Sequence, residues 1–112
     1  MVELATPPEH KLNEAGLTAI LARIRETSFS IKDNKIGTML IDSTENKFLV
    51  EVKMNKPGHR VNRMLTITRY EESRYFIRGT DKAAVYIEVQ CKYKDLFNTI
   101  SVAISKLALA PV

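Results

Sequence analysis

Few side chains in this sequence have the types and spacing needed for acid–base, nucleophilic or metal chemistry. The chain has one cysteine, Cys91, and two histidines, His10 and His59, whose separation fits no recognisable metal-binding spacing. Both histidines lie in segments that read as a leader or a turn, where a positioned general base is not expected. We therefore predict no catalytic residues, no metal site and no cofactor.

The glycines and the remaining candidate nucleophile support the same expectation. The four glycines are spread over positions 16, 37, 58 and 79, so no two could belong to a Walker or dinucleotide-binding loop. The adjacent Glu71 and Glu72 are typical of a charged turn rather than of an acid–base pair. Cys91 continues an alternation in phase with Val89, which predicts a small buried residue rather than a reactive thiol. The sequence therefore predicts a protein that binds without catalysing a reaction.

The basic residues are the feature that rises above background. The net charge is +4, and residues 51–94 hold ten Lys or Arg against five Asp or Glu, whereas residues 1–50 hold six against seven. This excess predicts a surface for an anionic partner, although a solvated sheet face would have the same composition. The densest group surrounds the turn at 55–60, and Lys82, Lys92 and Lys94 lie beyond the hairpin that follows it. The candidate anionic-ligand-binding residues are Lys53, Lys56, Arg60, Arg63, Arg69, Arg74 and Arg78.

Three kinds of partner fit this set. An acidic phospholipid membrane attracts basic clusters by about 1 kcal/mol per residue near its surface. RNA or single-stranded DNA is attracted by the same charges, and the interleaved Tyr70, Tyr75 and Phe76 could stack on bases. No aromatic RNA-binding motif or helix-turn-helix pattern favours nucleic acid, so acidic phospholipid is the leading prediction. The third kind is a partner protein or a second copy of the chain, bound through an edge strand or the C-terminal helix.

Hydrophobic periodicity predicts the elements that hold these residues. Asn13 is a candidate N-cap for a helix over 13–27, in which apolar residues recur at helical spacing from Leu17 to Ile24. The period then changes to two, which predicts strands near 29–31, 36–41, 47–54, 61–70, 74–78 and 83–93. A second helix is expected from Asp95 to Pro111, apolar over a wide face.

These elements predict an α+β fold, an antiparallel sheet of four to six strands flanked by an N-terminal and a C-terminal helix. The expected links between strands have about three to five residues, too short for crossover helices. Residues 1–12, with Pro7-Pro8, are predicted to be a flexible leader, and residues 13–110 a single domain. No apolar run approaches the ~20 residues of a membrane span. We expect a cytoplasmic protein, peripheral at a membrane if its ligand is lipid.

Three stretches resemble the kinase-associated domain (KA1) of Ser/Thr protein kinases. They are Phe29-Ser30-Ile31-Lys32 after the first helix, the strand Phe48-Leu49-Val50-Glu51-Val52, and the closing segment from Tyr93 to Leu107. The chain departs from the family in its larger number of predicted strands and in the strand after Arg78-Gly79-Thr80, where the family has its helix. The resemblance implies a regulatory module that binds acidic phospholipid or a kinase catalytic domain, with the basic residues as its membrane face.

Overall fold

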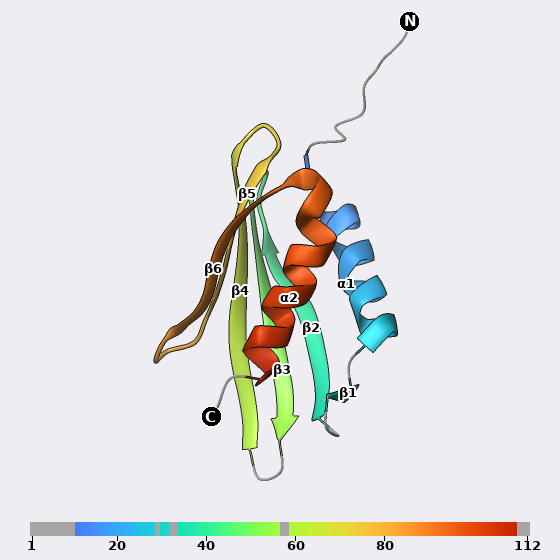
Figure 1. The fold of residues 1–112 in the computed structure, drawn as a ribbon, viewed down its shortest axis with the longest axis vertical. Coiled ribbons are helices and arrows are strands. Elements are labelled where there is room, and N and C mark those ends of the chain that lie inside the picture. The colour runs from blue at the N-terminus through green and yellow to red at the C-terminus, as the bar shows by residue number, and fades with distance from the viewer. Residues whose placement is uncertain (1–10, 29, 32–33, 57–58, 110–112) are drawn as a thin grey trace, which may run out of the picture.

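The chain folds into a six-stranded antiparallel sheet with two helices (Figure 1). The computed structural model describes residues 11–28, 30–31, 34–56 and 59–109. In chain order the elements are α1 (Glu14–Ser28), β1 (Ser30–Ile31), β2 (Asn34–Ser43), β3 (Lys47–Lys56), β4 (His59–Glu71), β5 (Arg74–Thr80), β6 (Val85–Lys92), the single-turn helix η1 (Tyr93–Asp95) and α2 (Leu96–Leu109).

The sheet is a meander in which every strand pairs with its neighbour in sequence. The spatial order is β1-β2-β3-β4-β5-β6, and all five pairings are antiparallel. Short links permit only this arrangement, because a parallel pair needs a long crossover connection. The predicted α+β class and its flanking helices are confirmed.

Both helices pack on the same face of the sheet (Figure 1). The N-terminus of α1 is capped as the sequence predicts, because the side chain of Asn13 accepts a hydrogen bond of 2.7 Å from the N–H of Gly16. Helix α2 lies mainly against β5 and β6, whereas α1 lies nearer β2. The two helices and one sheet face therefore enclose a single core, and the other sheet face carries no element among the described residues.

Strand alternation divides the side chains between these two faces. In β3 the buried residues are Phe48, Val50, Val52 and Met54, and each is at most 1% exposed. In β5 the buried Tyr75 and Ile77 alternate with Arg74, Phe76 and Arg78 on the opposite face. An antiparallel sheet with one packed and one wet face requires this period of two.

The predicted leader is too long by at least two residues. Leu12 is buried in the core, and its backbone N–H donates a hydrogen bond of 2.6 Å to the hydroxyl of Tyr75. Lys11 pairs with Glu45 in the β2–β3 turn at 2.7 Å. The expectation of flexibility was wrong for these two residues. Leu12 has no apolar neighbours at regular spacing, so the sequence gave no indication of its contact with Tyr75. The rest of the predicted leader, residues 1–10, lies outside the described residues.

Candidate functional site

The sheet face opposite the helices gathers side chains from β2 to β6. Cross-strand register aligns Lys47 of β3, Thr68 of β4, Phe76 of β5 and Gln90 of β6 in one row. On one side of this row Arg74 of β5 lies opposite Lys92 of β6. On the other side Arg78 lies between its cross-strand neighbours Thr66 and Glu88. We call this surface the open face.

An aromatic residue lies between two arginines on this face. Phe76 is half-buried at the middle of β5, and Arg74 and Arg78 are exposed two residues to either side of it. Alternate residues of a strand point to the same face, about 6.6 Å apart along the chain. Phe76 is therefore partly exposed on this face and has a cation on each side along the strand.

Tyr70 adds a second aromatic ring to the open face. It is the extra residue of a β-bulge, because Arg69 pairs with Tyr75 and Glu71 with Arg74. Its side chain is 43% exposed, and its hydroxyl donates a hydrogen bond of 3.2 Å to the Oε1 atom of Gln90 on β6. Since β5 lies between β4 and β6, this contact carries the ring of Tyr70 across β5, over roughly two strand spacings of about 4.8 Å.

The cations of the open face are only weakly engaged within the chain. Arg74 pairs with Glu71 at 3.5 Å, Arg78 with Glu88 at 3.2 Å, and Lys53 with Glu51 at 3.5 Å. Ion pairs between solvent-exposed groups contribute about 0–1 kcal/mol, so an external anion can compete for these arginines and this lysine. Lys47 and Lys92 are also exposed, and no carboxylate of the described residues lies within ion-pair distance of either.

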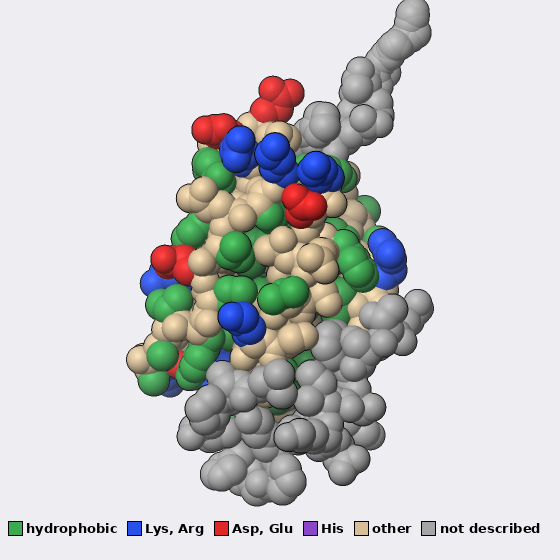
Figure 2. All heavy atoms as spheres, viewed as in Figure 1, with side chains coloured by type: hydrophobic (Ala, Val, Ile, Leu, Met, Phe, Trp, Pro, Cys, Tyr) green, Lys and Arg blue, Asp and Glu red, His purple; other side chains and the backbone are tan. Residues whose placement is uncertain are grey.

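The predicted basic set does not share one face. Lys53, Arg74 and Arg78 lie on the open face, whereas Arg63 and Arg69 lie on the helix-covered face. Arg69 is half-buried and bridges two turns, because its Nε donates to the carbonyl of Glu72 and its Nη1 to the side chain of Asn46. The backbones of Lys56 and Arg60 lie in the last pairs of the β3–β4 hairpin, but the structure does not describe their side chains. Figure 2 shows the helix-covered side, where basic and acidic side chains are interspersed.

The assignment of Arg63 to an anion-binding surface was wrong. Its side chain is only 1% exposed and its guanidinium lies 4.4 Å from the centre of the Tyr86 ring. Its Nη1 donates to the backbone carbonyl of Leu107 in α2, and its Nε pairs with Asp81 at 3.3 Å. The hydroxyl of Tyr86 donates to the same Asp81 carboxylate at 2.7 Å. A buried charge must be paired in this way, so Arg63 supports the fold rather than a ligand.

Hydrogen bonds hold the pKa of Asp81 at about 2, well below its usual value of 3.8. The largest cause is the hydroxyl of Tyr86, followed by the backbone N–H of Ala83, with smaller contributions from Ala84 and Arg63. The same contact raises the pKa of Tyr86. Near neutral pH Asp81 therefore stays ionised and Tyr86 stays protonated. The Asp81 carboxylate can then pair with Arg63 while it accepts the Tyr86 hydrogen bond.

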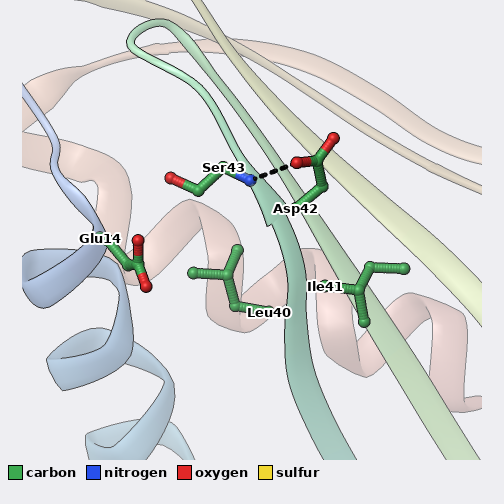
Figure 3. A pocket seen from close by; sticks show the side chains of 5 residues that line it. All are labelled: Glu14, Leu40, Ile41, Asp42 and Ser43. Atoms are coloured by element: carbon green, nitrogen blue, oxygen red, sulfur yellow. Dashed lines mark hydrogen bonds between the residues drawn. The ribbon is translucent and has the colours of Figure 1, made fainter.

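Two hollows of the described surface do not bring together groups that could catalyse a reaction. An open hollow of about 260 Å³ is lined by Glu14, Leu40, Ile41, Asp42 and Ser43. Figure 3 shows Glu14 and Asp42 on opposite sides of β2, and Asp42 accepts a hydrogen bond from the N–H of Ser43. A smaller hollow of about 110 Å³ is lined by Ser73, Lys92, Tyr93 and Lys94. Neither hollow pairs two carboxylates or places a nucleophile beside a base.

The remaining candidates for chemistry in the described part of the chain are Cys91 and the possible metal ligands. Burial raises the pKa of the half-buried Cys91 thiol above its usual value, which disfavours the reactive thiolate. No group of three His, Cys, Asp or Glu within the described ranges could hold a metal ion. Among the same residues, neither helix has the length and apolar character needed to cross a bilayer.

The open face depends on residues that sequence reasoning did not single out. Lys47 and Gln90 come to lie in one row with Phe76 only through cross-strand register, which a single sequence does not reveal. The alternation of Lys47, Glu51 and Lys53 with the apolar residues of the same strand is the signal in the sequence that indicates the face of Lys47. No protein-family model matches the chain, and neither a curated protein nor a solved structure matches it. The KA1 resemblance stays a prediction, and the function has to be argued from the open face.

Proposed function

We propose that this chain is a non-catalytic binding module that engages an anionic partner through the open face of its sheet. One observation carries the proposal: one exposed and one partly exposed aromatic side chain on this face are flanked by cations from three strands. We define the open-face cluster as these residues, Lys47, Tyr70, Arg74, Phe76, Arg78 and Lys92.

The charge of the cluster favours an anion. The cluster has four cations, and two of them form ion pairs with carboxylates, Arg74 with Glu71 and Arg78 with Glu88. Both carboxylates are more than half exposed. An anionic ligand would contact the arginines and could also use Lys47 and Lys92. A purely solvating face has no need of accessible rings beside its cations, so the combination supports a binding surface.

Acidic phospholipid remains a candidate ligand for this module. Lys53 is exposed near the end of the β3–β4 hairpin, and the backbones of Lys56 and Arg60 lie in the last pairs of the same hairpin. A membrane approaching this end would meet several basic positions together. Any regulatory role, which rests on the KA1 resemblance, stays a prediction.

The test compares two double variants that each remove two cations. Arg74→Ala with Arg78→Ala changes the open face, and Arg23→Ala with Lys106→Ala changes exposed residues of the helices on the other side. Sedimentation with phosphatidylserine vesicles and fluorescence anisotropy with a labelled single-stranded oligonucleotide measure binding. We expect at least one probe to bind, more weakly in high salt, and about tenfold more weakly to the open-face variant alone. Failure of both probes to bind, or equal losses in the two variants, would overturn the proposal.

A second candidate function is assembly through the edge of the sheet. Among the described strands β6 pairs only with β5, which leaves one side of its backbone open over Val85–Lys92. Val85 is also 47% exposed, whereas edge strands are commonly protected by lysine or proline. Light scattering after size exclusion should then show a dimer that Val85→Lys weakens. A monomer at all concentrations would exclude self-assembly through this edge.

A further inference from the structure

The open face offers more than charge, because its two aromatic rings come from neighbouring strands. Phe76 is partly exposed on β5, and Tyr70, which is 43% exposed, reaches across β5 to Gln90. No described element covers either ring. Adjacent accessible rings on a sheet can stack on unpaired bases, and this stacking tolerates any base because each has a π-face.

Polar groups surround the rings where base edges would lie. Thr68 and Gln90 are the cross-strand neighbours of Phe76. The Oε1 of Gln90 accepts from Tyr70, so the amide N–H groups of Gln90 remain as donors to a base. This arrangement suits a planar ligand with hydrogen-bonding edges better than an acyl chain.

The cations lie around the rings along a narrow path. Arg74 and Arg78 are on the same strand as Phe76, and Lys92 lies beside Arg74 on β6. A single nucleic-acid strand could follow this path with its bases on the rings and its phosphates on the cations. Duplex bases are already stacked on one another and could not use the rings in this way.

The charge around the cluster argues against a membrane as its ligand. The β4–β5 turn lies next to Tyr70 and Arg74 and carries exposed Glu71 and Glu72, and the β2–β3 turn carries exposed Glu45. A flat anionic surface covering the cluster would meet these carboxylates at the same end of the sheet. A flexible single strand can bend away from them.

We propose that the ligand of the open face is single-stranded nucleic acid, with unpaired bases stacked on Tyr70 and Phe76. Arg74, Arg78, Lys47 and Lys92 contact its phosphates. The proposal rests on the proposed function, since it names the ligand of the same surface. RNA and DNA differ here in the sugar, and the experiment compares the two directly.

Fluorescence anisotropy of the full chain tests this with labelled single-stranded RNA and DNA of the same unstructured sequence, and with a matched duplex. Phe76→Leu removes a ring from the open face, and Phe97→Leu removes a half-buried ring from the helix-covered side. We expect single strands to bind in preference to duplex, with about a tenfold loss for Phe76→Leu and less than about a twofold loss for Phe97→Leu. Better binding of RNA than DNA would point to a contact with the 2′-hydroxyl, and equal binding to recognition of bases and phosphates alone; either outcome supports the proposal.

Tyr70 gives a second test that does not depend on the packing of Phe76. Tyr70→Phe keeps the ring and should retain binding, whereas Tyr70→Ser should weaken it about tenfold. Tyr70→Ser and Phe76→Leu should not change the slope of log affinity against log salt concentration. Arg74→Ala should reduce that slope by the equivalent of about one phosphate contact. Equal binding of duplex, or indifference to both rings, would overturn the proposal. Vesicle binding without oligonucleotide binding would overturn it while leaving the proposed function intact, and binding of neither would overturn both.

Discussion

The guanidinium of Arg63, in β4 near the middle of the sheet, donates a hydrogen bond to the backbone carbonyl of Leu107 in the last turns of α2. This contact joins two segments 44 residues apart in sequence. It supplies a donor for a carbonyl at the helix end, where the last four have no partner within the helix. The positive charge of the guanidinium also interacts favourably with the dipole at the C-terminus of α2.

Replacing Arg63 with Met should destabilise the fold, because the Leu107 carbonyl loses its donor in a buried place. We expect a loss of about 1–3 kcal/mol in the free energy of unfolding, measured by urea denaturation. Arg78→Met is the matched control, since it removes an exposed arginine from the same sheet and should cost less than about 0.5 kcal/mol. Similar losses in the two variants would contradict the structural role of Arg63.

Acid should weaken the contacts of Asp81. The pKa of this carboxyl in the folded chain is about 2, below its usual value of 3.8, so its contribution to stability is fully present above pH 3.8. That contribution is lost as the pH falls from 3.8 towards about 2, where the folded chain too becomes protonated. Thermal melts across this range should show a decline in midpoint that is smaller in Asp81→Asn. An identical acid dependence in the two proteins would exclude Asp81 as a cause.

Gly79 should not tolerate a side chain. A Cβ atom at this position would lie 2.9 Å from the Cγ2 of Ile87 and 3.0 Å from the Cδ2 of Leu107. We expect Gly79→Ala to lower the free energy of unfolding by about 1–3 kcal/mol, the usual cost of overpacking. Gly37→Ala is the control, because nothing lies within 4 Å of its Cβ position. An unchanged stability of Gly79→Ala would mean that α2 can move away from β5 at little cost.

Removing the hydroxyl of Tyr75 should release the segment before α1. Tyr75→Phe leaves the N–H of the buried Leu12 without its acceptor, which should cost about 1–3 kcal/mol. Hydrogen exchange should show faster exchange at Leu12 in particular. Tyr70→Phe removes an exposed hydroxyl instead and should leave the Leu12 amide protected. Protection of Leu12 in both variants would show that another group accepts its hydrogen bond.

The sequence revealed those parts of the fold that depend on local pattern. The alternation of Phe48, Val50 and Val52 identified both the strand and its buried face, and Asn13 identified the start of α1. These features depend on side-chain period and capping, which are properties of neighbouring residues. Short links then excluded any parallel arrangement of the strands.

The open-face cluster could not be predicted in the same way. Its rows depend on register, and the bulge at Tyr70 moves that ring across β5, neither of which follows from one strand's residues. Arg63 is a different case. It lies in phase with Leu65 and Ile67, a signal of burial that the prediction of an anion-binding residue overlooked, and its partners Asp81 and Leu107 are far away in sequence.

The meander has a consequence for how the chain acquires its structure. Each strand pairs with the next one along the chain, so the ladders form through short loops whose closure costs little entropy. Contacts between elements that are not neighbours in the chain are mainly those of α1 and α2 with the sheet and with each other. A fold whose strands all pair with their neighbours in sequence should reach its native state quickly for a β-rich protein, with the docking of the two terminal helices as its step of highest contact order.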